Sequence, residues 1–137
     1  MVRDFAENEV EPLAREMDEK ETIPKDLIDK MGKLGIMGIP VPEKYGGAGM
    51  DTVAYATAIM ELAKVDASVA ITVAAHTSLG TMPIVLAGTE EQKMKYVPDL
   101  SSGKVLGAFG LTEPEAGSDA GATKTTAVKN GDEYEIN

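Results

Sequence analysis

The chain has no cysteine and only one histidine among its 137 residues. Without cysteine there is neither a disulfide framework nor a thiolate metal site, and a single histidine argues against a histidine-based metal centre. Acidic residues outnumber basic ones, giving a formal net charge of −10, so nucleic acid and anionic membranes are poor partners. We therefore predict no bound metal and no nucleic-acid partner.

No targeting segment is visible at the N-terminus. The opening sequence "MVRDFAENEVEPLARE" is too charged for a secretory signal peptide and too acidic for a transit peptide. The absence of cysteine also fits a reducing compartment. We expect a bacterial cytoplasmic protein.

The longest uncharged stretch runs from Ala67 to Thr89 and raises the question of a membrane span. It carries polar residues together with glycine and proline, at Ser68, Thr72, His76, Thr77, Ser78, Gly80, Thr81 and Pro83. A helix with no charged face is typical of the middle of a helical bundle. We expect a core helix here and no membrane span.

Hydrophobic periodicity predicts a helical bundle in the first three quarters of the chain. We expect helices over residues 2–18, 23–35, 52–66, 67–79, 82–88 and 89–97. Asp51 should cap the third helix, and Thr89 with Gln92 should form a capping box on the last. Gly35 should end the second helix in a left-handed conformation, and residues 36–50 should form an ordered loop, because their apolar side chains need burial. Pro12 should kink or divide the first helix, and Pro98 should begin a turn after the last.

After Gly103 the pattern changes to that of strands. The run "KVLGAFGLT", residues 104–112, is typical of a strand, and Asn130-Gly131 is a two-residue hairpin signal inside the alternating segment "TTAVKNGDEYEIN". The predicted fold class is mainly α: a helical domain over residues 1–104, then the first strands of a β domain over residues 105–137.

The stretch "GLTEPEAGSDAG", Gly110–Gly121, directly follows the apolar run "VLGAF". Its glycines allow sharp turns and close approach of a ligand, while its hydroxyls and free amides suit a phosphate or a flavin edge. It has neither P-loop spacing nor the dinucleotide-binding fingerprint. Composition by itself leaves a plain surface turn as the alternative.

The segment "GAFGLTEPEAGSD" closely resembles the signature of the acyl-CoA dehydrogenases, flavin enzymes that oxidise acyl-CoA thioesters. The segments "EKYGGAGMD", "ELAKVDASVAITVAAHTSLG", "LAGTEEQKMKYVPDLSSGK" and "NGDEYEIN" are also similar to that family, in the family's order. Short-chain and butyryl-type members are the nearest. The resemblance spans essentially the whole chain, and it implies an N-terminal fragment whose first helix is trimmed.

The resemblance implies that FAD is the cofactor. The residues carried over as cofactor-binding are Phe109, Gly110, Leu111, Thr112, Gly117 and Ser118, with the Leu111 amide and the Thr112 hydroxyl at the pyrimidine edge and Ser118 at the pyrophosphate. Ser118 is also expected near the CoA moiety, and Val73, His76 and Thr77 along the acyl tail. We expect His76 to be a buried, hydrogen-bonded histidine and not a catalyst. Glu113 and Asp119 are interpreted as loop-shaping residues, because the family's catalytic glutamate lies in a later helical bundle.

Two alternative functions are considered, one enzymatic and one non-enzymatic. In the first, the chain is the N-terminal part of an FAD-dependent acyl-CoA dehydrogenase that forms trans-2-enoyl-CoA, passes electrons to an electron-transferring flavoprotein, and is a homotetramer at full length. This fragment is expected to be inactive by itself. In the second, the chain is a stand-alone, non-catalytic helical module that folds and self-associates.

Overall fold

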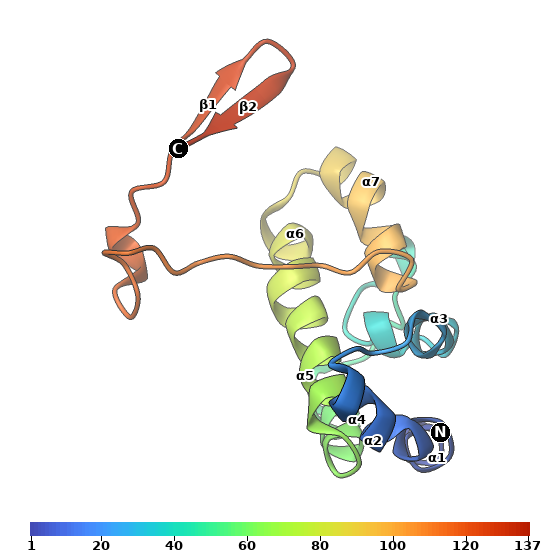
Figure 1. Ribbon diagram of the computed structural model, residues 1–137. Helices are drawn as coiled ribbons and strands as arrows, with labels where there is room; N and C mark the ends of the chain where they lie inside the picture. The colour runs from blue at the N-terminus through green and yellow to red at the C-terminus, as the bar shows by residue number, and fades with distance from the viewer.

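The computed structural model describes residues 1–137 as a bundle of helices and a β-hairpin (Figure 1). A long segment, residues 102–126, joins the two and is called the arm. The α-helices are α1 (Val2–Phe5), α2 (Glu11–Lys20), α3 (Lys25–Lys33), α4 (Thr52–Ala63), α5 (Ala67–Ala75), α6 (Met82–Ala87) and α7 (Glu90–Ser101). The strands are β1 (Ala127–Asn130) and β2 (Glu133–Ile136). The prediction of a mainly helical fold is confirmed.

Two π-helical turns join α-helices into longer rods. One, η1 (Ala6–Val10), lies between α1 and α2, and the other, η4 (His76–Thr81), lies between α5 and α6. The kink or break expected at Pro12 takes the form of the π turn η1, which lies just before it. Pro12 itself stands in the first turn of α2, where the missing amide costs least.

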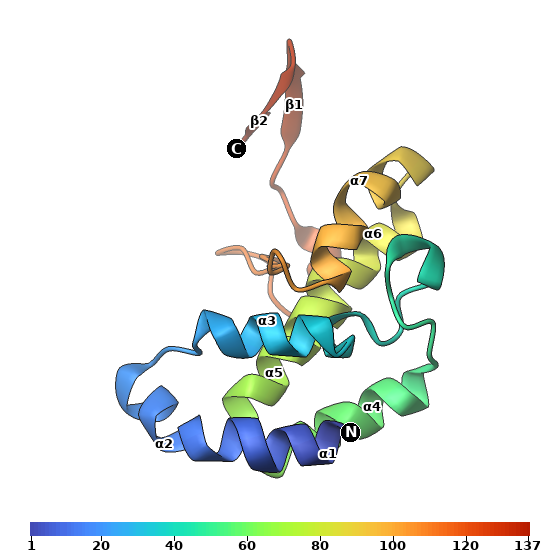
Figure 2. The same ribbon diagram turned by 90° about the vertical axis from the view of Figure 1, so that its right-hand side faces the viewer.

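The helix from Ala67 to Ala87 corrects the expected break at Gly80 and Pro83. The π turn carries the chain past Gly80, and Pro83 falls in the first turn of α6, so the rod continues. This rod is long and apolar enough by composition to cross a membrane. Only 33% of its apolar stretch is buried in the bundle, so the expected core helix is one on its inner side alone. Its N-terminal half, which passes behind α3 in Figure 2, packs against α4 and supplies Val69, Ala70 and Val73 to the main core.

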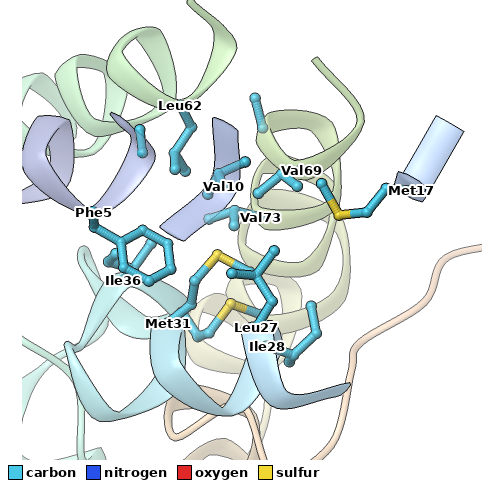
Figure 3. Close-up of a cluster of buried hydrophobic side chains, with 13 residues drawn as sticks. Phe5, Val10, Met17, Leu27, Ile28, Met31, Ile36, Leu62, Val69 and Val73 are labelled. Carbon is cyan, nitrogen blue, oxygen red and sulfur yellow. The ribbon is translucent and has the colours of Figure 1, made fainter. Parts of the chain in front are cut away.

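The main core is a cluster of thirteen buried residues from α1, η1, α2, α3, η2 (Ile36–Gly38), α4 and α5. Leu27, Ile28 and Met31 of α3 point toward Val73 of α5 and Val10 of the first rod (Figure 3). Burying a side chain of this size contributes about 1.5–3 kcal/mol. The predicted amphipathic stripes are thus the core-forming faces.

Local cap signals predicted from the sequence are present. Asp51 accepts a hydrogen bond from the Ala54 amide at 2.8 Å, and Thr89 and Gln92 form the expected reciprocal capping box. Gly35 takes a left-handed conformation, with φ of 74°, just after α3. These predictions depended on neighbouring residues alone, and the structure confirms them.

Helix α7 does not end before Pro98, as the sequence had indicated, but continues to Ser101. Val97, Leu100 and Ser101 are all buried. Packing of this last turn therefore outweighs the hydrogen bond that proline cannot donate.

The glycine-rich segment between α3 and α4 is an ordered loop, as predicted. It contains η2 and the short helix η3 (Glu43–Tyr45), and it buries Val41 and Tyr45 in a second cluster with Val97 of α7. A Cβ on Gly47 would lie 2.1 Å from the Val41 carbonyl oxygen. No larger residue fits there without moving the backbone.

The strand predicted over residues 104–112 is wrong. This part of the arm is extended but has no neighbouring strand, because no other segment of the chain lies beside it to form a ladder. The hairpin is confirmed, with Asn130 paired to Glu133, so that its two-residue loop is Gly131-Asp132, one residue later than expected. Gly131 has the positive φ, 63°, that such a tight loop needs at its first position.

Candidate functional site

The arm crosses the α5–α6 rod at the π turn η4 (Figure 1). There the Gly107 amide donates to Nδ1 of His76 at 2.9 Å, and Nε2 of His76 lies 3.1 Å from the Leu100 carbonyl oxygen. Because a backbone amide can only donate and a carbonyl can only accept, His76 is the neutral Nε2–H tautomer. The predicted buried, hydrogen-bonded histidine is confirmed.

The same crossing depends on two glycines. A Cβ on Gly80 would lie 2.6 Å from Cα of Gly107, and a Cβ on Gly107 would lie 2.8 Å from Cα of Gly80. The two backbones therefore touch without intervening side chains. Sequence reasoning missed Gly107 and its contact, although a glycine inside an apolar extended run is a known sign of close backbone approach.

Beyond the crossing, the arm carries polar donors without intramolecular partners. The amides of Phe109, Gly110, Leu111 and Thr112 make no hydrogen bond within the chain, and neither do the amides of Gly117 and Ser118 or the hydroxyls of Thr112 and Ser118. A Cβ on Gly110 or Gly117 would meet no atom within 4 Å. This donor set fits the acceptor atoms of a flavin ring and of a phosphate, although the segment adds no cation for a pyrophosphate.

Glu113 shapes the loop that follows. Its carboxylate accepts the backbone amides of Lys124 at 2.7 Å and Thr125 at 3.1 Å, and its own backbone pairs with Ala116. These hydrogen bonds lower the pKa of Glu113, with the Lys124 amide the largest cause. A carboxylate held in this way is a poor general acid, in agreement with the loop-shaping interpretation.

The three residues predicted along the acyl tail lie close together but are already engaged inside the bundle. Val73 belongs to the main core, His76 is bonded at both nitrogens, and the Thr77 hydroxyl donates to the Met37 carbonyl at 3.4 Å. Each is at most 1% exposed. Burial lowers the pKa of His76, which the carbonyls of Leu100 and Met37 oppose only in part.

The main hollow of the bundle lies elsewhere. It has a volume of about 710 Å³ and opens between the start of α1, the loop after α3 and the first half of α4. None of the predicted cofactor or substrate residues lines it. The candidate site is therefore the arm and its crossing, not this hollow.

A comparison with models of known protein families identifies the family of this chain. The model of the acyl-CoA dehydrogenase N-terminal domain matches residues 1–104. The chain belongs to the acyl-CoA dehydrogenase family. The resemblance read from the sequence is confirmed.

Two relatives show which members of the family are similar to this chain. It is 56% identical over all 137 residues to an acyl-CoA dehydrogenase of Bacillus subtilis. It is 53% identical to the short-chain specific acyl-CoA dehydrogenase of Clostridium acetobutylicum, also over its whole length. The chain spans 36% of the length of each relative and corresponds to their N-terminal part.

Two solved structures resemble this chain over 99% of its length. A chain from a structure described as the electron transferring flavoprotein of Acidaminococcus fermentans has a TM-score of 0.92 at 48% identity, and 36% of that chain is covered. The Bacillus anthracis acyl-CoA dehydrogenase complexed with FAD has a TM-score of 0.89 at 42% identity, with 24% covered. Family members therefore include an FAD-bound enzyme.

Proposed function

We propose that the chain is the N-terminal part of an FAD-dependent, short-chain type acyl-CoA dehydrogenase, which converts acyl-CoA to trans-2-enoyl-CoA. Residues 1–104 are its helical domain and residues 105–137 begin its β domain. The observation that carries the proposal is the arm from Phe109 to Ser118, where the family-like sequence presents unpaired donors. The chain by itself is inactive in this proposal, because the base comes from a later part of such an enzyme.

In this function the arm holds the cofactor by neutral donors. FAD supplies the chemistry by accepting a hydride from the substrate. The Leu111 amide and the Thr112 hydroxyl donate to the edge of the ring where negative charge gathers on reduction, and Ser118 donates to the pyrophosphate. Phe109 lies along the flavin, while Gly110 and Gly117 keep the backbone open for close approach, as their free surroundings support.

The proposed substrate is a short acyl-CoA. Ser118 meets the CoA moiety, and Val73, His76 and Thr77 form the wall beside the acyl tail. All three side chains are buried, and of them only His76 is hydrogen-bonded to the arm, so the tail can touch them only if the packing around them opens. An electron-transferring flavoprotein is the proposed electron acceptor, the full-length protein is proposed to be a cytoplasmic homotetramer, and no membrane span is proposed.

The second candidate, a self-associating helical module without catalysis, is favoured by one observation. Large apolar side chains are exposed on the α5–α6 rod and on the arm, at Ile71, Leu79, Leu86, Leu106 and Phe109. Exposed apolar surface promotes association. A visible absorption scan and light scattering of the purified chain separate the candidates: flavin bands favour the first, and a colourless oligomer favours the second.

A hybrid enzyme tests the proposal directly. Residues 1–137 are joined to the remainder of the Bacillus subtilis relative, which is 56% identical over this region. We expect the hybrid to bind FAD and to oxidise butyryl-CoA. A folded hybrid that takes up no flavin contradicts the proposal.

Thr112→Val in the hybrid tests the assigned donor. Valine keeps the shape and removes the hydroxyl, so the reduced flavin loses one hydrogen bond. Losing about 1–3 kcal/mol from the reduced state lowers the two-electron midpoint potential by about 20–60 mV. Thr123→Val is the matched control, because Thr123 is exposed on the same arm and its hydroxyl has no partner. Equal potentials in the two variants would remove Thr112 from the flavin site.

A further inference from the structure

One hydrogen bond ties the stretch from Leu106 to Thr112 to the helical bundle. It runs from the Gly107 amide to Nδ1 of His76. The next tie on the N-terminal side is the Val105 amide, which donates to the Asp99 carbonyl at 3.2 Å. The proposed flavin-binding donors begin at Phe109, two residues beyond the His76 bond.

His76 is held through both its ring and its backbone carbonyl. Its Nε2–H donates to the Leu100 carbonyl near the end of α7, and its backbone carbonyl accepts the Thr81 hydroxyl at 2.9 Å. The ring is 1% exposed, so no water replaces these partners. One buried side chain thus links the α5–α6 rod, the end of α7 and the arm.

Because two glycines meet at the crossing, the position of the arm there depends on the hydrogen bond that Nδ1 of His76 accepts. Since Gly80 and Gly107 touch through their backbones, no side chain of the arm packs there to hold position by its shape. Leu106 and Phe109, on either side of Ala108 and Gly107, are both about half exposed. The arm's course at this point depends on a hydrogen bond more than on side-chain packing.

We infer that His76 is a positioning residue, which sets the course of the Phe109–Ser118 segment through its Nε2–H tautomer and its acceptor at Nδ1. The flavin part of this inference rests on the proposed function. His76 touches neither cofactor nor reacting atoms in this role. It acts through Gly107 on the donors that follow.

Two substitutions separate the two bonds of the ring. In His76→Asn, the side-chain oxygen takes the place of Nδ1 and can still accept from Gly107. In His76→Gln, the side-chain amide takes the place of Nε2–H and can still donate to Leu100, but the acceptor for Gly107 is lost. Thr81→Val is the control, because it removes a buried hydrogen bond of the same π turn and leaves both ring nitrogens of His76 with their partners.

The first measurement is made on the 137-residue chain by NMR. We expect ¹⁵N shifts of the His76 ring to report Nε2–H, and the Gly107 amide to exchange about five- to tenfold faster in His76→Gln than in His76→Asn. Thr81→Val should leave the exchange of Gly107 close to that of the parent once the loss of overall stability is subtracted. An Nδ1–H ring, or equal Gly107 exchange in the two His76 variants, overturns the inference.

The second measurement uses the hybrid enzyme. His76→Gln is expected to weaken FAD binding about five- to tenfold relative to His76→Asn, the factor that one lost hydrogen bond represents. Thr81→Val, matched in unfolding free energy, should retain the parent affinity. If the parent hybrid binds no FAD, the proposed function fails, while the NMR result still decides whether His76 positions the arm. If FAD binding follows stability across all three variants, His76 is merely structural and the inference is overturned.

Discussion

Replacing Gly80 by alanine has two opposing effects on the free energy of unfolding. In an unobstructed helix the change stabilises by about 1 kcal/mol, because alanine is the better helix former. At this position, however, the added Cβ would lie 2.6 Å from Cα and 2.7 Å from the carbonyl carbon of Gly107. Both are backbone atoms, so the overlap is relieved only if the arm or the helix moves.

The magnitude follows from these two terms. Overpacking of this kind costs about 1–3 kcal/mol, which exceeds the gain in helix propensity, so we expect a net loss of up to about 2 kcal/mol. Withdrawal of the arm also breaks the bond between Gly107 and His76. The Gly107 amide should therefore lose its protection from exchange, even where overall stability changes little.

Urea unfolding followed by circular dichroism measures the free energy, and amide exchange measures the local effect. Gly110→Ala is the matched control, since a Cβ there meets nothing within 4 Å. It should be neutral or stabilise by about 0.4–1 kcal/mol through the unfolded chain. If Gly80→Ala is more stable than the parent and Gly107 remains protected, the two backbones are not in contact in solution and the reasoning fails.

Three further outcomes are expected. Burial lowers the pKa of His76 in the folded chain, so its contribution to stability is complete above the unfolded pKa of about 6.5 and is lost as pH falls, by at most about 1.4 kcal/mol per pH unit. Urea titrations between pH 7 and pH 5 should show this slope in the free energy of unfolding, and His76→Gln should abolish it. Glu113→Gln replaces one of two accepting oxygens, so exchange at Lys124 or Thr125 should accelerate, and unchanged exchange at both would mean that Glu113 does not hold these two amides. Thr89→Ala should destabilise the chain by about 1 kcal/mol in thermal unfolding through loss of the capping box, whereas no change would mean that α7 frays at its start.

Features set by near neighbours in the chain could be predicted from the sequence. The caps at Asp51 and Thr89 and the hairpin near Gly131 each depend on a few adjacent residues, and each is present. The apolar periodicity of residues 2–18 and 23–35 also located part of the main core, including Val10, Met17 and Met31. Local chemistry fixes these features before any tertiary contact forms.

Features set by distant partners could not be predicted. The end of α7 depends on burial of Leu100, and the arm is no strand because it lacks a neighbour. In the candidate site, the partners of His76 lie 24 and 31 residues away, at Leu100 and Gly107. Burial of His76 was expected from its apolar surroundings, but nothing in the local pattern identifies those partners.

The π turn η4 also sets the rotational phase of one rod against two separate cores. Before it, Val69 and Val73 face the main cluster; after it, Met82, Ile84 and Val85 face the second cluster around Tyr45. Each residue of an α-helix advances the direction of its side chain by about 100°. A π turn holds one residue more than an α turn, so deletion of a single residue within η4 would let the rod become uniformly α-helical. That deletion would nearly preserve the direction of the second half relative to the first, whereas a deletion within the regular turns of α5 or α6 would rotate the second half by about 100°. The rod should therefore tolerate many substitutions on its exposed face, and the loss of one residue should disturb the two cores less inside η4 than in the flanking α-helices.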